Sequence, residues 1–244
     1  MSAGESPGLA SRIDTLGRER PDFVLMGPYL AYLLLLAVRD WVPVEWQWTA
    51  NLLRGVGPLV IVWMWRRHLP ALGKPHIPLA IGAALVAAAG WAAGHHFFVE
   101  TLGLPQRLPL FPGTPDDPTE LSPFAGLSAA VAWLNVVTKI GVAVTTVAVV
   151  EELFWRGFLL RALISWAEFE KEPLGAFTWF SFIGTSLIST IQHPDTWAVS
   201  IPCWLFFNAV MVWKKSLLMM MITHGLTNLF LYIYVIYAGD WALW

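Results

Sequence analysis

Charged residues are scarce in this chain, and their scarcity already excludes several classes of protein. Only 13% of the 244 residues are charged, whereas a typical soluble domain has about 25%. Apolar residues reach 57%, and 15 residues are tryptophan. A water-soluble protein needs polar side chains over its outside, so this composition excludes a soluble enzyme and a disordered chain. The protein is expected to lie within a membrane.

Cysteine and excess positive charge are lacking as well. The one cysteine, Cys203, cannot form an intrachain disulfide, and in an apolar run it is typical of a small buried side chain. The formal net charge of −2 gives no basic field that would attract DNA or RNA. We therefore expect membrane lipid, and no nucleic acid, among the partners.

Long apolar runs are what the sequence has instead. Backbone groups in hydrocarbon must form hydrogen bonds within the chain, so these runs predict helices, and no segment alternates in polarity as a barrel strand would. The runs cover residues 23–38, 50–65, 77–98, 124–166, 176–191, 197–213 and 217–237. The predicted fold is all-α, a polytopic transmembrane bundle of seven to eight helices.

The fourth run is too long for a single crossing. As one helix it would be roughly 64 Å long, about twice the thickness of the hydrocarbon layer. Lys139 lies inside the run, and a helix from Lys139 to Arg161 would place its charged ends at the two interfaces. The sequence therefore predicts a crossing over 139–161 and a separate helix over 124–138.

Loop charges predict the orientation. Basic residues precede the first run and occupy loops at 66–74 and 214–215, whereas the loop at 103–123 is acidic. The positive-inside rule then makes the N-terminus cytoplasmic. We divide the chain into a polar N-terminal segment, 1–22, and one integral domain, 23–244, in the cell (plasma or inner) membrane.

Four groups of polar residues interrupt the apolar runs. An ionisable side chain inside a membrane span costs a few kcal/mol or more, so each group is a candidate functional site. The groups lie at 151–156, 192–193, 224–228 and 95–96. The last group is close to the end of its run and is interpreted as interfacial.

Helical spacing suggests different roles for these residues. Glu152 and Arg156 are four residues apart, in the order that favours an intrahelical ion pair. Glu151 points about 100° away and is free to act as a general base. His224 and Asn228 are also four residues apart, so their N–H donors could hold an oxyanion together.

Depth along the helices gives a check on this grouping. Counted inward from the basic loops, Glu151 lies about 15 Å deep and His224 about 13 Å deep, so the two match. His193 comes out at about 27 Å, too deep for the same site. A tilted helix, or a break at Pro194, would bring His193 back to that level.

Taken in order, the three motifs resemble those of a known family. The EExxxR sequence at 151–156, a later helix ending in His193 and HxxxN at 224–228 look like the CAAX prenyl protease and bacteriocin-processing (CPBP) family. That family consists of glutamate-type intramembrane proteases. The resemblance covers 149–244, and the ending, 238–244, further resembles a bacterial subgroup associated with exosortase sorting systems.

The resemblance implies a role for each matching residue. Glu151 would activate a water with help from His193, while His224 and Asn228 would stabilise the oxyanion. The supporting residues would be Glu152 and Arg156. No metal or other cofactor is implied. The partners would be a peptide or protein substrate presented at the membrane and an exosortase-type sorting system.

One position departs from the family pattern. The family often has Phe four residues before the histidine of the second motif, and this chain has Ser189 there. A smaller, polar side chain at this wall would alter the fit of a substrate.

Three other interpretations of the same residues are open at this point. A zinc protease would take Glu151, His193 and His224 as ligands, although the sequence has no HExxH motif. A serine protease would pair Ser186 with His224, on no more than a Gly-x-Ser pattern. A non-catalytic membrane scaffold, immunity or partner-binding protein would use the same polar cavity for recognition.

Overall fold

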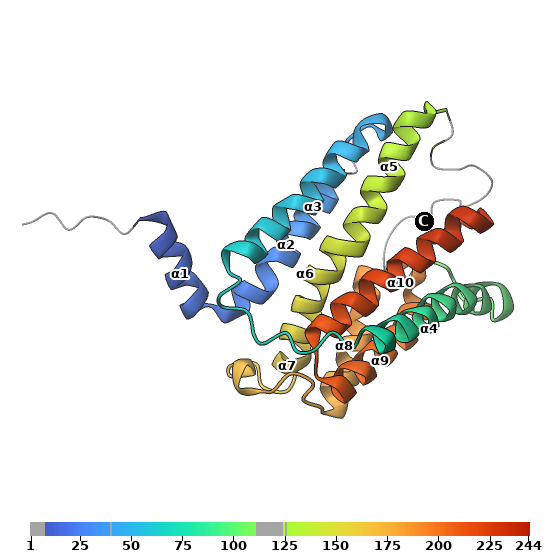
Figure 1. The fold of residues 1–244 in the computed structure, drawn as a ribbon. Helices are drawn as coiled ribbons and strands as arrows, with labels where there is room; N and C mark the ends of the chain where they lie inside the picture. Colours follow the sequence, from blue (N-terminus) through green and yellow to red (C-terminus); the bar gives the residue numbers. More distant parts are fainter. Residues whose placement is uncertain (1–7, 40, 111–123, 125) are drawn as a thin grey trace, which may run out of the picture.

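The computed structural model describes residues 8–39, 41–110, 124 and 126–244. All regular structure within this part of the chain is helical, so the predicted all-α fold is confirmed (Figure 1). Within these described residues, five helices are long and apolar enough to cross a membrane. The helices are α1 (Leu9–Glu19), α2 (Pro21–Arg39), α3 (Gln47–Met64), α4 (Ile77–His96), a long helix comprising α5 (Ala129–Val142), α6 (Ala148–Glu152) and α7 (Leu160–Ala162), then α8 (Trp179–Gln192), α9 (Trp197–Lys214) and α10 (Leu217–Ala238).

The predicted division of the fourth apolar run is wrong. One helical course of 34 residues runs from Ala129 to Ala162, with no break before Lys139. The division assumed that lipid surrounds Lys139, so that its charge would have to reach an interface. Tertiary packing removes that need, because the Lys139 ammonium donates to the main-chain oxygen of Trp244, 2.9 Å away.

Two wide π-helical turns interrupt this long helix. They are η3 (Ala143–Val147) and η4 (Leu153–Leu159), and they lie on either side of α6. A π turn shifts the register of the side chains that follow it and leaves backbone carbonyls in need of other donors, and such turns are frequent at functional sites. The short segment between them carries both glutamates of the EExxxR motif.

The helices form two groups that meet at α6. In one group α2 packs against α3 and α3 against α5; in the other α10 packs against α4, α4 against α9, and α9 against α8. Segment α6 and its flanking π turns contact α2 on one side and α10 on the other (Figure 1). The glutamates of α6 therefore lie at the junction of the two groups.

Small residues allow the close helix packing around α10. The buried residues of α4, which packs on α10 and on α9, are mostly alanines and include Ala80, Ala84, Ala87 and Ala88. Small side chains of this kind let helix backbones approach closely in a membrane. Where α10 crosses η3, Gly225 lies directly against the backbone of Val144. This crossing positions His224, the neighbour of Gly225, beside α6.

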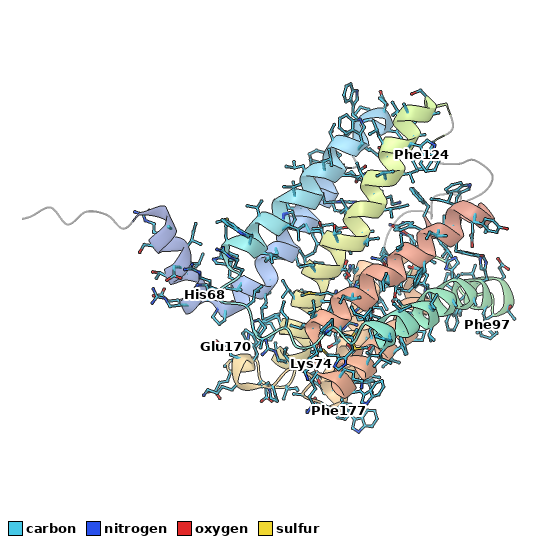
Figure 2. The ribbon with its side chains drawn as sticks, viewed as in Figure 1. His68, Lys74, Phe97, Phe124, Glu170 and Phe177 are labelled. Carbon is cyan, nitrogen blue, oxygen red and sulfur yellow. The ribbon has the colours of Figure 1, made fainter. Side chains whose placement is uncertain are left out.

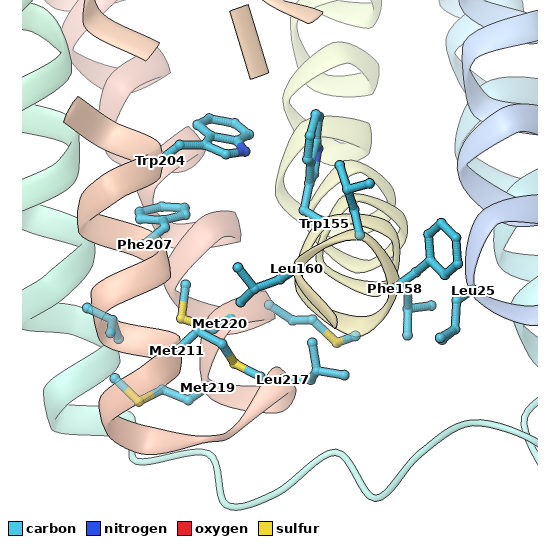
Figure 3. Packing of buried hydrophobic residues seen from close by; sticks show 14 of the residues in the cluster. Leu25, Trp155, Phe158, Leu160, Trp204, Phe207, Met211, Leu217, Met219 and Met220 are labelled. Atoms are coloured by element: carbon cyan, nitrogen blue, oxygen red, sulfur yellow. The ribbon is translucent and has the colours of Figure 1, made fainter. Parts of the chain in front are cut away.

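The largest apolar cluster fills the space between η4, α9 and α10. Figure 3 shows three of its aromatic side chains, Trp155, Trp204 and Phe207, above a layer that includes Met211 and Met220. Met220 and Met211 are fully buried. The cluster thus provides a dry, close-packed floor next to the glutamates of α6.

The basic loops lie at one end of the bundle, as the positive-inside argument requires. Figure 2 shows His68, Lys74 and Glu170 at this end, where the linker between α3 and α4 and the chain after α7 are found. Helix α1 is held there by Asp14, whose carboxylate is 3.0 Å from the ring of His68. Most of the predicted acidic loop at 103–123 lies outside the described residues.

We predict that Gly225→Ala destabilises the protein. A Cβ at this position would overlap with the carbonyl oxygen of Val144, which belongs to the backbone and cannot move aside alone. Overpacking of this kind costs about 1–3 kcal/mol. A thermal unfolding curve of the purified chain in detergent should show a clearly lower midpoint.

The matched control is Gly82→Ala on α4, where a Cβ would meet nothing within 4 Å. Alanine is the better helix former, so this variant should unfold at the same or a higher temperature. Equal midpoints for the two alanine variants would contradict the close crossing of α10 and η3.

Candidate active site

A cavity of about 1120 Å³ lies between the two groups of helices. Its wall includes the four side chains that the sequence predicts to be catalytic, Glu151, His193, His224 and Asn228. They come from α6, from the end of α8 and from two successive turns of α10. The structure therefore brings these residues together around one space, although they are widely separated in the sequence.

Glu151 is held by one oxygen and leaves the other unbonded. Its side chain is only 3% exposed, and Oε1 accepts a hydrogen bond from Nε2 of Gln192. Gln192 is itself fixed, because Trp155 donates to its Oε1 at 2.9 Å. Oε2 of Glu151 is buried and has no hydrogen-bond partner. This arrangement orients the carboxylate and keeps one oxygen for another molecule.

His224 lies between the two glutamates. Its Nδ1 is 2.9 Å from Oε1 of Glu152, a hydrogen-bond distance, while its Nε2 is 3.9 Å from Oε2 of Glu151, which is too far for one. The Glu152 contact fixes the orientation of the ring. The sequence predicted Glu152 only as the partner of Arg156. The structure adds a second role, because Glu152 also contacts His224.

Arg156 joins Glu152 to α8 and α9. The predicted i, i+4 ion pair is present, with Nη1 of Arg156 2.9 Å from Oε1 of Glu152, and both side chains are completely buried. Nε of Arg156 donates to Oδ1 of Asn208 at 3.1 Å. The guanidinium also lies over the rings of Trp204 and Phe207, at 5.1 and 5.3 Å. The positive charge of Arg156 is thus neutralised by Glu152 and enclosed by the two aromatic rings.

Asn208 was not among the predicted site residues. Its side chain is fully buried and donates to the hydroxyl of Ser186 at 3.1 Å and to the carbonyl of Phe182 at 3.2 Å. An amide inside the apolar run 197–213 was the available signal, since such a group must find partners away from water. Asn208 couples Arg156 to α8.

The same contacts bear on the serine-protease interpretation. The hydroxyl of Ser186 donates to the carbonyl of Phe182 at 2.9 Å and accepts from Asn208, so it faces neither His224 nor the cavity. Ser189 is also buried, and its hydroxyl donates to the carbonyl of Ser186 within α8. The departure from the family pattern at Ser189 therefore adds no reactive group to the cavity.

His193 follows the last residue of α8, directly before Pro194. Its ring packs edge-on between Trp91 and Trp204, with centroid distances of 5.3 and 5.1 Å. Nε2 is buried and has no hydrogen-bond partner. Helix α8 begins only at Trp179 and is about 21 Å long, so the depth count that began near residue 175 overestimated the depth of His193.

The side chain of Asn228 forms a hydrogen bond with the backbone of the first π turn, η3. Its Nδ2 donates to the carbonyl oxygen of Ala143, the first residue of η3, at 2.8 Å. The amide nitrogen carries two hydrogens, so one N–H is used in this bond and one is left over. The side chain is half-buried and lines the cavity beside His224.

The zinc interpretation needs three ligands within reach of one ion. Over residues 8–39, 41–110, 124 and 126–244, no group of three or more His, Cys, Asp or Glu side chains has that geometry. Glu151, His193 and His224 share the cavity but do not form such a group.

The comparison with protein families agrees with the motifs. Residues 132–230 match the model of the family described as Type II CAAX prenyl endopeptidase Rce1-like. The matched segment begins within α5, ends within α10 and contains all six predicted site residues, so the resemblance to the CPBP family is confirmed over this part of the chain. It supports a CAAX protease-type intramembrane endopeptidase. No curated protein and no solved structure matches the chain. The exosortase association stays a prediction.

We predict that Arg156→Met strongly destabilises the protein. The change removes the cation and leaves the carboxylate of Glu152 buried beside His224 without its ion pair. Removal of one partner from a buried pair costs about 3–5 kcal/mol. Chemical unfolding of the purified variant in detergent measures the loss.

Two variants serve as controls. Glu152→Gln combined with Arg156→Met removes both charges, so it should recover part of the lost stability. Lys171→Met removes an exposed lysine that pairs with Glu168 on a loop, and should leave unfolding unchanged. An Arg156→Met protein as stable as the parent would contradict a buried, energetically coupled pair.

Proposed function

We propose that the chain is an intramembrane endopeptidase in which Glu151 activates the attacking water. The observation that carries the proposal is the arrangement of Glu151 and His224. One oxygen of the carboxylate is fixed by Gln192, the other is buried and unbonded, and Nε2 of His224 lies 3.9 Å from that free oxygen. Such a pair is suited to bind a reacting molecule, and it stands in the wall of a cavity large enough for a peptide.

The first step is the activation of water. Glu151 Oε2 and His193 Nε2 are both buried, both lack a partner and both belong to the cavity wall. Buried polar atoms are rarely left unbonded, so a water in the cavity is their natural partner. In the proposed reaction the water transfers a proton to Glu151 as its oxygen bonds to the carbonyl carbon of the substrate, while His193 holds the water in place.

The second step is stabilisation of the oxyanion that forms on the carbonyl oxygen. The donors are Nε2–H of His224 and the N–H of Asn228 that is not bonded to Ala143. Nδ1–H of His224 donates to Glu152, so donation from Nε2 as well requires the imidazolium form, which here is flanked by two carboxylates.

The last step breaks the peptide bond. Glu151 returns its proton to the peptide nitrogen, the C–N bond breaks, and the electron pair leaves with the amine. The products are a carboxylic acid and an amine, and Glu151 is again a carboxylate. One water is consumed and no metal or redox cofactor takes part in the proposed sequence of steps.

A non-catalytic scaffold would use these residues differently. In the structural pair, Oε2 of Glu152 and Nη2 of Arg156 also lack hydrogen-bond partners, but neither residue lines the cavity. The unbonded atoms of Glu151 and His193 instead face a space open to another molecule. This contrast favours a reaction over a structural role.

The proposed orientation places the mouth of the cavity outside the cell. The wall includes Val44 after α2, Gln106 after α4 and Trp244 after α10; each of these helices begins where the basic loops lie, so the three residues belong to the opposite end of the bundle. With those loops and the N-terminus in the cytoplasm, a substrate would enter from the external side or from the outer half of the bilayer.

We predict that Glu151→Gln abolishes peptide hydrolysis while the fold is retained. Glutamine keeps the shape of the side chain but cannot accept the proton of the water, and removal of a general base costs about 10²–10⁴-fold in rate. Mass spectrometry of a randomised apolar peptide library, incubated with the full chain in liposomes, measures cleavage.

Glu168→Gln, on an exposed loop, is the control and should cleave at the parental rate. Undiminished cleavage by Glu151→Gln would overturn the proposed mechanism. Cleavage that is lost on treatment with a strong chelator and restored by zinc would favour the metalloprotease interpretation instead.

We predict the orientation through cysteine labelling. The native Cys203 is buried, so we expect the reagent to label only cysteines that are introduced at exposed positions. A membrane-impermeant maleimide added to intact cells should label Leu110→Cys, at a position that is 86% exposed, and should not label Lys171→Cys. The reverse pattern would contradict a cytoplasmic N-terminus.

A further inference from the structure

The mouth of the cavity carries a group of cations that the proposed reaction does not use. Arg39, Arg54 and Lys139 line the cavity on α2, α3 and α5. Among the described residues of the wall, the carboxylates are Glu151, at the other end, and Asp195, which pairs with Arg107 at 3.0 Å. Over the described residues, the wall is therefore acidic at Glu151 and basic where Arg39, Arg54 and Lys139 lie.

Lys139 already binds an oxygen from outside its own helix. Its ammonium donates to the main-chain oxygen of Trp244 at 2.9 Å, lies 4.1 Å from the centre of the Trp244 ring and 5.5 Å from that of Tyr232. The turn η7 (Trp241–Leu243) brings this oxygen into the cavity wall. Arg39 and Arg54 also have interactions of their own, and Arg54 lies over the ring of Tyr32 in the same wall.

Two amides beside the cations favour a peptide over a lipid headgroup. Asn51 and Asn135 line the same cavity, and each has a buried Oδ1 without a hydrogen-bond partner. An extended peptide supplies N–H donors for such acceptors. The phosphodiester group itself is an anion without a donor, and a headgroup adds at most a few hydroxyl or amine donors, whereas an extended peptide has an N–H at every residue except proline.

The distance from Lys139 to Glu151 determines how many residues of a bound peptide would lie between these two side chains. Both residues are on the continuous helix from Ala129 to Ala162, and their separation along its axis is roughly 18 Å. An extended chain advances about 3.3–3.6 Å per residue, so about five residues span the gap.

We propose that Lys139, supported by Arg39 and Arg54, binds a carboxylate of the peptide substrate about five residues from the bond that is cleaved at Glu151. The carboxylate is an acidic side chain or a free chain end, which have the same chemistry. The position of the cleaved bond rests on the proposed function, whereas the recognition of the carboxylate does not.

The test measures binding without cleavage. The full chain with Glu151→Gln is placed in phosphatidylcholine nanodiscs, and fluorescent ten-residue Ala/Leu peptides are titrated by anisotropy. One peptide carries a single Glu and an amidated end, one has Gln in its place, and one has Gln and a free carboxyl end. We expect at least one acidic peptide to bind about 10-fold tighter than the neutral one, which identifies the source of the carboxylate.

The preference for acid should depend on Lys139. Lys139→Met should abolish it, Lys139→Arg should retain it, and Lys74→Met, at the opposite end of the bundle, should leave it unchanged. Equal binding of acidic and neutral peptides, no binding of any peptide, or a preference that survives Lys139→Met would each overturn the proposal. So would Lys139-dependent retention of phosphatidylglycerol in place of peptide.

The cleavage position is a separate readout. With Glu151 intact, cleaved library peptides should carry an acidic group about five residues from the new end in the parent protein and not in Lys139→Met. An acid placed one or two residues from the cut would contradict the proposed distance. Absence of all cleavage together with acid-selective binding would count against the proposed function alone.

Discussion

The buried ion pair between Glu152 and Arg156 is the interaction on which the site depends. A lone carboxylate or guanidinium in a membrane interior is too costly to keep, so each must be neutralised and hydrogen-bonded within the protein. Arg156 meets this need through Glu152 and Asn208, and the aromatic rings of Trp204 and Phe207 exclude water around it. The network joins α6, η4 and α9 into one unit.

His224 connects this unit to the reaction. Because Glu152 is already paired, its second contact can hold the imidazole of His224 in one orientation, with Nε2 toward Glu151. The π turns contribute from the backbone side, since Asn228 satisfies the carbonyl of Ala143 in η3. Charge pairing and backbone pairing thus fix the donors that the proposed reaction needs.

The cavity extends well beyond the segment that matches the family. Residues 132–230 include the glutamates, both histidines and Asn228, but α2 and α3 lie outside this range. These two helices supply a large part of the wall, including Arg39 and Arg54. The proposed chemistry therefore lies within the matched segment, whereas the proposed recognition of the substrate combines Lys139, inside that segment, with Arg39 and Arg54, outside it.

Local patterns in the sequence were sufficient to predict that the protein lies in a membrane, that it is helical and which residues form the motifs. The apolar composition indicates that lipid surrounds the protein. A spacing of four residues brings Glu152 and Arg156 together across one helix turn, whatever surrounds them. The position of His193 was harder to place, because depth counted along a single helix ignores where that helix begins. Thr178 caps α8 and starts it later than the apolar run suggested.

Only the tertiary structure decided what each polar group faces. Lys139 was expected to end a membrane crossing, yet it lies within a continuous helix because Trp244 and Tyr232, distant in sequence, surround its ammonium. Gln192 and Asn208 gained their roles in the same way, from partners on other helices. Hydrogen bonds and ion pairs between helices depend on packing geometry, which no spacing along one helix contains. The sequence by itself thus determined which residues are polar and where they lie along their helices, and the packing of the helices determined which of them meet.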